Sequence, residues 1–245
     1  MSNLLAEGFR RLFKGKRFYV VLTIIMAIPA AACIFIKIFE DSTVNVGDGI
    51  VFGMIGTMTM FISVTVGLFI IHDFKNNTIR NKIIIGHSRT NIYLANLIIS
   101  LVVAFIYQLA YWLVLIVFSK TLQRFESFPC KEIFVNMLFT IVILFAFTSF
   151  FVFLCTSIRS TGGFVLSLML DTIVTMIAGI VYMFVKNELV RDIIDYGLPS
   201  TQIDCFKYAP TTVSDNLMWM ILVDIGICIV STIAGIAIFK KSDLK

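Results

Sequence analysis

The stretch IFVNMLFTIVILFAFTSFFVFLCTS, residues 133–157, decides the fold class of this chain. It holds 25 residues, and none of them is Asp, Glu, Lys or Arg. About 20 helical residues cross the roughly 30 Å hydrocarbon core of a bilayer, so this run is long enough to span a membrane. Its apolar residues do not alternate with polar ones, and backbone groups in lipid need internal hydrogen bonds. We therefore expect a transmembrane helix over 133–157.

Similar apolar runs recur along the whole chain of 245 residues. Hydrophobic residues make up 59% of it, charged residues make up 14%, and the mean hydropathy is +0.96. A water-soluble protein of this size needs far more polar surface, so a soluble fold is excluded. The sequence predicts an all-α membrane protein with one six-helix transmembrane domain at 18–239. The six predicted spans are 18–39, 50–71, 93–118, 133–157, 163–185 and 217–239.

The basic residues are divided unevenly between the two sides of this domain. Thirteen of the 20 Lys and Arg residues flank the side that holds both chain ends. Basic residues in short loops mark the cytoplasmic side, so we expect cytoplasmic termini, including the tail at 240–245. The net charge of +5 is then an orientation signal and not a nucleic-acid surface. The thirteen are Arg10, Arg11, Lys14, Lys16, Arg17, Lys75, Arg80, Lys82, Arg89, Arg159, Lys240, Lys241 and Lys245.

Residues 1–17 precede the first span and have the pattern of an amphipathic helix. Apolar residues recur at helical spacing, and basic residues lie between them, as a helix lying in the membrane interface requires. Such a helix either only anchors the first span or also transmits motion to it. The apolar residues are Leu4, Leu5, Gly8, Phe9, Leu12 and Phe13, and the basic residues are Arg10, Arg11 and Lys14.

The cytoplasmic connection at 72–92 is longer than a chain reversal needs. Its run from Thr78 to Ile85 is compatible with a short helix that Gly86 ends, and Ser88 or Thr90 is placed to cap the next span. An apolar face on such a helix favours a docking surface for another protein, or packing on the membrane surface. The expected apolar residues are Ile79, Ile83 and Ile84, with the basic Arg80 and Lys82 on other faces.

The string NTIRNKIIIGHSRTNIY at 77–93 resembles the stretch after the second span in permeases of the type-2 ABC exporter family. In that family the stretch is a coupling helix that sits in a groove of the ATPase subunit. Many members have Glu at the position of Asp73 and a small or apolar residue at that of His87. The resemblance implies an ATPase-coupling set made of Asp73, Thr78, Ile79, Arg80, Lys82, Ile83, Gly86, Ser88 and Arg89.

This resemblance also implies a function. The chain would be the permease subunit of an ATP-driven exporter in the bacterial cytoplasmic membrane, paired with an identical or sister permease. A separate ATPase chain would hold ATP and Mg²⁺, so this chain would carry no cofactor and would not itself be an enzyme. An amphipathic or antimicrobial peptide, a peptide toxin or a lipid-like molecule is the expected cargo.

Two carboxylates lie inside predicted spans. Asp171 and Asp224 are costly if they face lipid, so they face protein or a water-filled cavity. They either line a substrate path or cation site, or they fix helix packing. The alternative function is a self-sufficient channel or ion-coupled carrier that uses both. Carriers often have broken helices at matching positions in two halves, and only Pro29 breaks a span here.

Catalytic motifs are missing from the sequence. It has no Gly-x-x-x-x-Gly-Lys-Ser/Thr phosphate loop, no His-Glu-x-x-His, and no cysteine pair at zinc spacing. Cys130 and Cys205 lie in different outer segments and either pair in an oxidising compartment or stay unpaired. The longest connection, 186–216, is too short for a catalytic domain and is either an outer cap, a re-entrant helix pair or a loop.

Small residues at a spacing of four occur in two predicted spans. They are Ser63 with Gly67 in the second span and Ser231 with Gly235 in the last. Small residues at this spacing allow helices to approach closely. They suit a dimer interface without identifying one.

Overall fold

The computed structural model describes residues 1–39, 55–122, 131–208 and 213–241, and every regular element in these ranges is a helix. The helices are α1 (Ser2–Lys14), α2 (Lys16–Phe39), α4 (Ile55–Lys75), α5 (Thr78–Ile84), α6 (Arg89–Leu122), α7 (Lys131–Ile158), α8 (Thr161–Phe184), α9 (Glu188–Gly197), α10 (Pro199–Tyr208) and α11 (Leu217–Lys241).

Within these residues, six helices are long and apolar enough to cross a membrane: α2, α4, α6, α7, α8 and α11. They coincide with the six predicted spans, so the all-α prediction with six long apolar helices is confirmed. The boundaries differ by four residues at the end of the second span and at both ends of the third, since α4 ends at Lys75 and not at residue 71, and α6 runs from Arg89 to Leu122 and not over 93–118. Ser88 explains the earlier start, because its Oγ accepts a hydrogen bond from the backbone N–H of Asn91 at 3.3 Å. The first part of the predicted second span, 50–54, lies outside the described residues.

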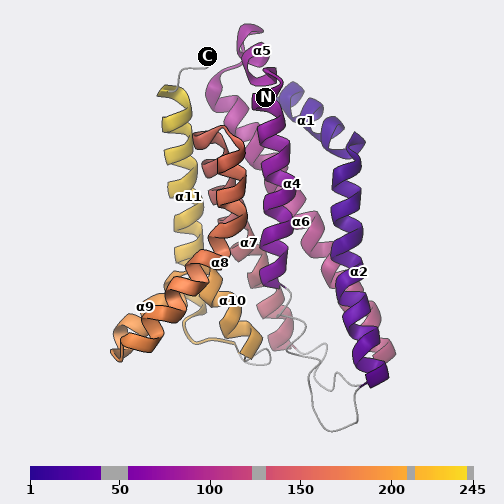
Figure 1. Cartoon of the computed structure of the whole chain (residues 1–245), viewed down its shortest axis with the longest axis vertical. Coiled ribbons are helices and arrows are strands. Elements are labelled where there is room, and N and C mark those ends of the chain that lie inside the picture. Colours follow the sequence, from indigo (N-terminus) through magenta and orange to yellow (C-terminus); the bar gives the residue numbers. More distant parts are fainter. Residues whose placement is uncertain (40–54, 123–130, 209–212, 242–245) are drawn as a thin grey trace.

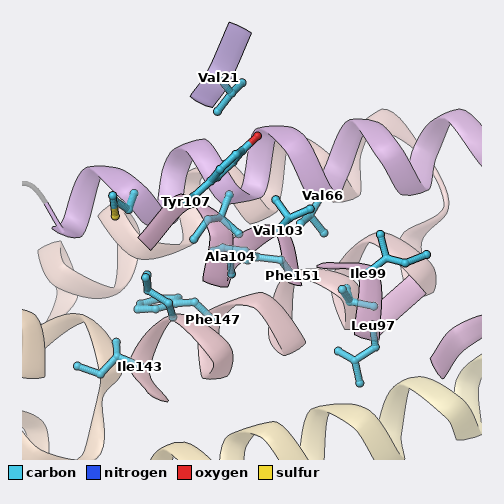
Figure 2. Packing of buried hydrophobic residues seen from close by; sticks show 14 of the residues in the cluster. Val21, Val66, Leu97, Ile99, Val103, Ala104, Tyr107, Ile143, Phe147 and Phe151 are labelled. Atoms are coloured by element: carbon cyan, nitrogen blue, oxygen red, sulfur yellow. The ribbon is translucent and has the colours of Figure 1, made fainter. Parts of the chain in front are cut away.

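Helix α7 is the centre of the bundle and packs against α4, α6, α8 and α11. Its fully buried side chains include Ile143, Phe151 and Val152. Figure 2 shows Val66 of α4 and Val103 of α6 gathered with Phe151 in one buried cluster. Lipid tails are as apolar as these side chains, so the hydrophobic effect does not drive helices together inside a membrane. Close van der Waals packing of the cluster stabilises the bundle instead.

Small residues make the closest helix contacts. The Tyr93 ring of α6 lies where a Cβ at Gly235 of α11 would be, and the Phe164 ring of α8 lies in the same way against Gly67 of α4. Ser231 of α11 donates a hydrogen bond to Ser149 of α7 at 3.1 Å. Gly67 of the first predicted pair and both residues of the second therefore serve contacts within this chain.

The two ends of the bundle differ. Helices α1 and α5 and the end of α11 lie at one end, and α9 and α10 lie at the opposite end (Figure 1). The predicted outer segment is a helix pair: Ser200, Thr201 and Gln202 of α10 are buried, whereas no residue of α9 is. Figure 1 shows α9 projecting from the bundle. The interpretation of 186–216 as a helical cap fits this pair better than a loop does.

Candidate functional site

Four charged side chains meet at the end of the bundle that carries α5, and we call them the charged cluster: Glu7, Arg11, Asp73 and Lys82. The guanidinium of Arg11 on α1 donates two hydrogen bonds to the Asp73 carboxylate on α4, the second at 2.8 Å from Nη2 to Oδ2. Nζ of Lys82, on α5, lies 3.5 Å from Asp73 Oδ2 and 3.6 Å from Glu7 Oε2. The charged cluster therefore joins three helices.

Because the charged cluster is partly buried, its members depend on one another for charge compensation. The Asp73 side chain has no exposed surface, whereas Arg11 keeps 26% and Glu7 48% of theirs. Burial lowers the pKa of Arg11 and of Lys82, and the nearby Glu7 carboxylate acts in the opposite direction on both. Cationic hydrogen-bond donors stabilise a buried, ionised carboxylate, and removing one member of such a cluster leaves the others uncompensated.

Helix α1 places Arg11 against Asp73. Leu4, Gly8 and Leu12 are buried, which confirms the predicted apolar face, and Gly8 lets α1 approach Ile99 of α6 closely. Arg11 was expected on the polar face, and that expectation is wrong. Its guanidinium is turned inward over the ring of Phe69, 4.2 Å from the centroid, because the buried Asp73 needs a cationic partner.

Helix α5 is short and sharply bounded. Asn77 precedes it in the left-handed region at φ 53°, and Gly86 follows it at φ 100°. The N–H of Gly86 donates to the carbonyl of Ile83 at 2.9 Å, and the N–H of His87 donates to that of Lys82 at 3.1 Å. These two bonds form a Schellman motif, which needs a residue with positive φ. The prediction that Gly86 ends this helix is confirmed.

The faces of α5 differ from the expectation. Ile79 and Lys82 point into the bundle and are buried, so the expectation that Ile79 belongs to an exposed docking face is wrong, and Lys82, expected on another face, shares the buried face of Ile79. Ile79 and Lys82 are three residues apart and so lie on the same face of α5. The contact of Lys82 with the buried Asp73 turns this face toward the bundle. The apolar surface that remains is Ile84, 73% exposed, and its neighbour Ile85, 77% exposed.

The rest of the predicted coupling set surrounds this exposed pair. Arg80 and Gly86 are exposed, and Thr78 and Ile83 are partly buried. We call Arg80, Ile84 and Ile85 the α5 tip. Helical spacing alone does not single out Ile85, the last of the three consecutive isoleucines Ile83, Ile84 and Ile85.

Arg89 has a different task from the α5 tip. Its Nη1 donates to the carbonyl of Lys240 at 2.9 Å and lies 3.3 Å from that of Phe239, both in the last turn of α11. A cation at a helix C-terminus is favoured by the free carbonyls and the helix dipole. The rings of Phe74 and Phe239 meet edge to face nearby, with centroids 6.3 Å apart. Arg89 thus ties the start of α6 to the end of α11.

The two carboxylates inside the long apolar helices lie apart from the charged cluster and have different surroundings. Asp171 of α8 is partly buried, with Oδ2 3.0 Å from the Thr59 hydroxyl of α4. Asp224 of α11 is fully buried, and the side chain of Gln202 from α10 faces it. Neither oxygen of Asp224 has a hydrogen-bond partner of normal geometry among the described residues. Asp224 therefore faces protein, as expected from its cost in lipid, whereas Asp171 contacts the protein through Thr59 and keeps part of its surface exposed.

The described residues hold no group of three or more His, Cys, Asp and Glu side chains that could bind a metal ion. Cys205 is part of α10, whereas Cys130, its suggested disulfide partner, lies outside the described residues.

The charged cluster and the α5 tip together form the candidate functional site, because one contains buried ion pairs and the other exposes apolar side chains. No protein-family model and no curated protein matches the sequence of this chain.

Proposed function

We propose that this chain is the transmembrane permease subunit of an ATP-driven ABC exporter. A separate ATPase chain, holding ATP and Mg²⁺, docks on the α5 tip, and a second permease chain completes the translocation path. The cargo is an amphipathic or antimicrobial peptide, a toxin or a lipid-like molecule. The proposal places α5 and both termini in the cytoplasm, in agreement with the basic residues gathered at that end.

One observation carries this proposal: the inner face of α5 is held by buried ion pairs, and its outer face exposes apolar side chains. Lys82 joins α5 to the charged cluster, while Ile84 and Ile85 are more than two-thirds exposed. A helix that only reversed the chain would need neither the buried ion pairs nor an apolar tip. An exposed apolar pair beside Arg80 has the composition of a protein-binding surface, since such surfaces combine apolar anchors with Arg.

The charged cluster supplies a route from the docking surface into the membrane. A displacement of α5 acts on Asp73 through Lys82, and Asp73 belongs to α4, one of the long apolar helices. Arg11 passes the same displacement to α1, which is joined to α2 through Gly15 alone. Stiff elements joined by discrete ion pairs move together as a unit, which is what switching between access states requires.

The helix α8 supports the participation of a second chain. Its side chains at Met176, Met183 and Phe184 are all at least two-thirds exposed in the single chain. Asp171 lies on the same helix, and its Thr59 contact connects it to α4. A second copy placed against α8 would enclose Asp171 between two chains, as a polar group lining a path would require.

The test is reconstitution with and without an ATPase. The proposal predicts that a neighbouring reading frame encodes an ATPase with Walker motifs, and that liposomes containing both proteins export peptide only with ATP. Transport by the purified chain alone, with no ATPase present, would reject the proposal. Arg80→Ala should reduce ATPase association while leaving membrane insertion intact.

The second candidate is an ion-coupled carrier, and the surroundings of Asp224 favour it. A fully buried carboxylate without a basic partner among the described residues is a common ligand for protons or cations in transporters. This candidate predicts uptake driven by an ion gradient in liposomes that contain only this chain. Asp224→Asn should then abolish uptake, whereas an ATP requirement would favour the exporter.

A further inference from the structure

A cavity of about 310 Å³ lies at the elbow between α1 and α2, where both meet α4. Its lining has two chemically different parts. Apolar side chains, including Phe18, Val21 and Val64, form one wall. Basic side chains form the other part: Arg11, Lys16, Arg17 and His72. No Asp or Glu lines it.

Two of the basic side chains that line the cavity, Lys16 and Arg17, are not paired with an acidic residue of the described ranges. Arg11 is committed to Asp73, but Lys16 and Arg17 are exposed and form no salt bridge with any residue in the described ranges. They also begin α2, a helix of 24 residues whose N-terminus carries the positive end of the helix dipole. The potential in this part of the cavity is therefore positive, and an anionic group would be favoured there.

The position of the cavity selects the kind of anion. Lys16 and Arg17 stand where the apolar run of α2 starts, so the basic part lies at the level of lipid headgroups and the apolar wall extends toward the acyl chains. A free phosphate would use only the basic part. A phospholipid would use both, with its phosphate beside Lys16 and Arg17 and an acyl chain along Phe18 and Val64.

We infer that this cavity, which we call the elbow cavity, binds the phosphate headgroup of an anionic phospholipid. This site is independent of the ATPase surface and of the translocation path, so it stands whether or not the chain is an exporter. Basic pockets between transmembrane helices at the cytoplasmic side suit such headgroups. The bound lipid would brace the elbow next to Arg11 and so reinforce the charged cluster.

Native mass spectrometry of the purified full chain tests this inference. The probes are dioleoylphosphatidylglycerol and dioleoylphosphatidylcholine, which share acyl chains and differ in headgroup charge. The wild type should retain one phosphatidylglycerol far more tightly than phosphatidylcholine. Millimolar glycerol phosphate should not displace it. Equal retention of the two lipids would overturn the inference, and full displacement by glycerol phosphate would assign the site to a free phosphate.

Two double variants with the same charge change separate the cavity from general surface charge. Lys16→Gln with Arg17→Gln removes two basic side chains that line the elbow cavity. Arg10→Gln with Lys14→Gln removes two exposed basic side chains of α1 that do not line it. Each basic residue near an anionic headgroup contributes about fivefold, so the first variant should bind about 25-fold more weakly. The second should change binding by less than about threefold. Equal losses would contradict the inference.

A variant that keeps every charge covers the case in which the first one folds poorly. Val64→Phe narrows the apolar wall from α4, where the side chain is only partly buried. It should also weaken phosphatidylglycerol retention, with an unchanged elution volume in gel filtration. Unchanged retention would show that the acyl chain does not occupy the cavity.

Discussion

Arg11 and Asp73 stand 62 residues apart in the sequence, yet the guanidinium of one donates two hydrogen bonds to the carboxylate of the other. This pair joins α1, at the surface of the bundle, to α4, which packs against its central helix. Because Lys82 contacts the same carboxylate, the pair also determines where α5 lies. Asp73 is therefore the residue on which the geometry of this end of the bundle depends.

Asp73→Asn should destabilise the protein by about 3 kcal/mol, the lower end of the cost of breaking a buried ion pair, because Arg11 keeps some contact with solvent. The variant leaves Arg11 without its carboxylate partner and leaves Lys82 with only the half-exposed Glu7 as an anionic neighbour. A thermal scan in detergent should show a Tm several degrees below that of the wild type. Glu7→Gln, at the exposed rim of the cluster, is the control and should cost at most about 1 kcal/mol. Similar effects of both changes would contradict the assigned roles.

Gly235→Ala should destabilise the contact between α6 and α11 by roughly 1–3 kcal/mol, because the added methyl group overlaps the buried Tyr93 ring. The control lies on the same helix: at Gly226 nothing stands within 4 Å of an added Cβ, so Gly226→Ala should be neutral or slightly stabilising. Tm values in detergent measure both. Adding Tyr93→Leu should recover part of the loss, and strictly additive effects of the two changes would argue against the contact.

Asp195→Asn should remove a pH dependence of stability. Partial burial raises the pKa of Asp195 on α9, whose carboxylate accepts a hydrogen bond from Tyr182. Between the ordinary pKa of 3.8 and the raised value, the folded chain holds a proton that the unfolded chain has released. The contribution of Asp195 to stability is therefore greatest below this window and falls as the pH rises through it.

Paired Tm series from pH 3.5 to 7 measure this effect. The difference in Tm between the wild type and Asp195→Asn should change with pH between 3.8 and the raised pKa, and it should be constant above that pKa. Asp192→Asn, at an exposed position of the same helix, provides the matched control. A difference that stays constant over the whole range would show that Asp195 has no altered titration.

The six long helices were predictable because each needs only an uninterrupted apolar run, a property of neighbouring residues. Gly86 was equally predictable, since a glycine after a short helical run is a local signal. The start of α6 was missed by four residues because its first turn is polar, and polar residues are read as loop. Ser88 is placed to cap a helix, but the polar residues after it do not extend the apolar run, so the predicted span begins later.

The charged cluster was not predictable, because its partners are distant in the chain. Arg11 and Lys82 each occupy a position that helical spacing alone places among solvated basic residues. Both face the buried carboxylate of Asp73, and the sequence offers no sign that residue 73 is buried while its neighbour His72 is exposed. The same contact rotates Ile79 inward and leaves Ile84 and Ile85 as the exposed pair.

Binding of the ATPase to the α5 tip tests the central proposal most directly. The variant is Ile84→Ser with Ile85→Ser, and its matched control is Leu189→Ser with Ile193→Ser, an equally exposed apolar pair on α9 at the opposite end. Neither variant touches the core, so both should insert and keep the Tm of the wild type. The measurement is the affinity of the purified ATPase for each protein in nanodiscs. The proposal predicts at least about a tenfold loss for the α5 variant and none for the α9 variant. Wild-type affinity of the α5 variant, or an equal loss in both, would contradict it.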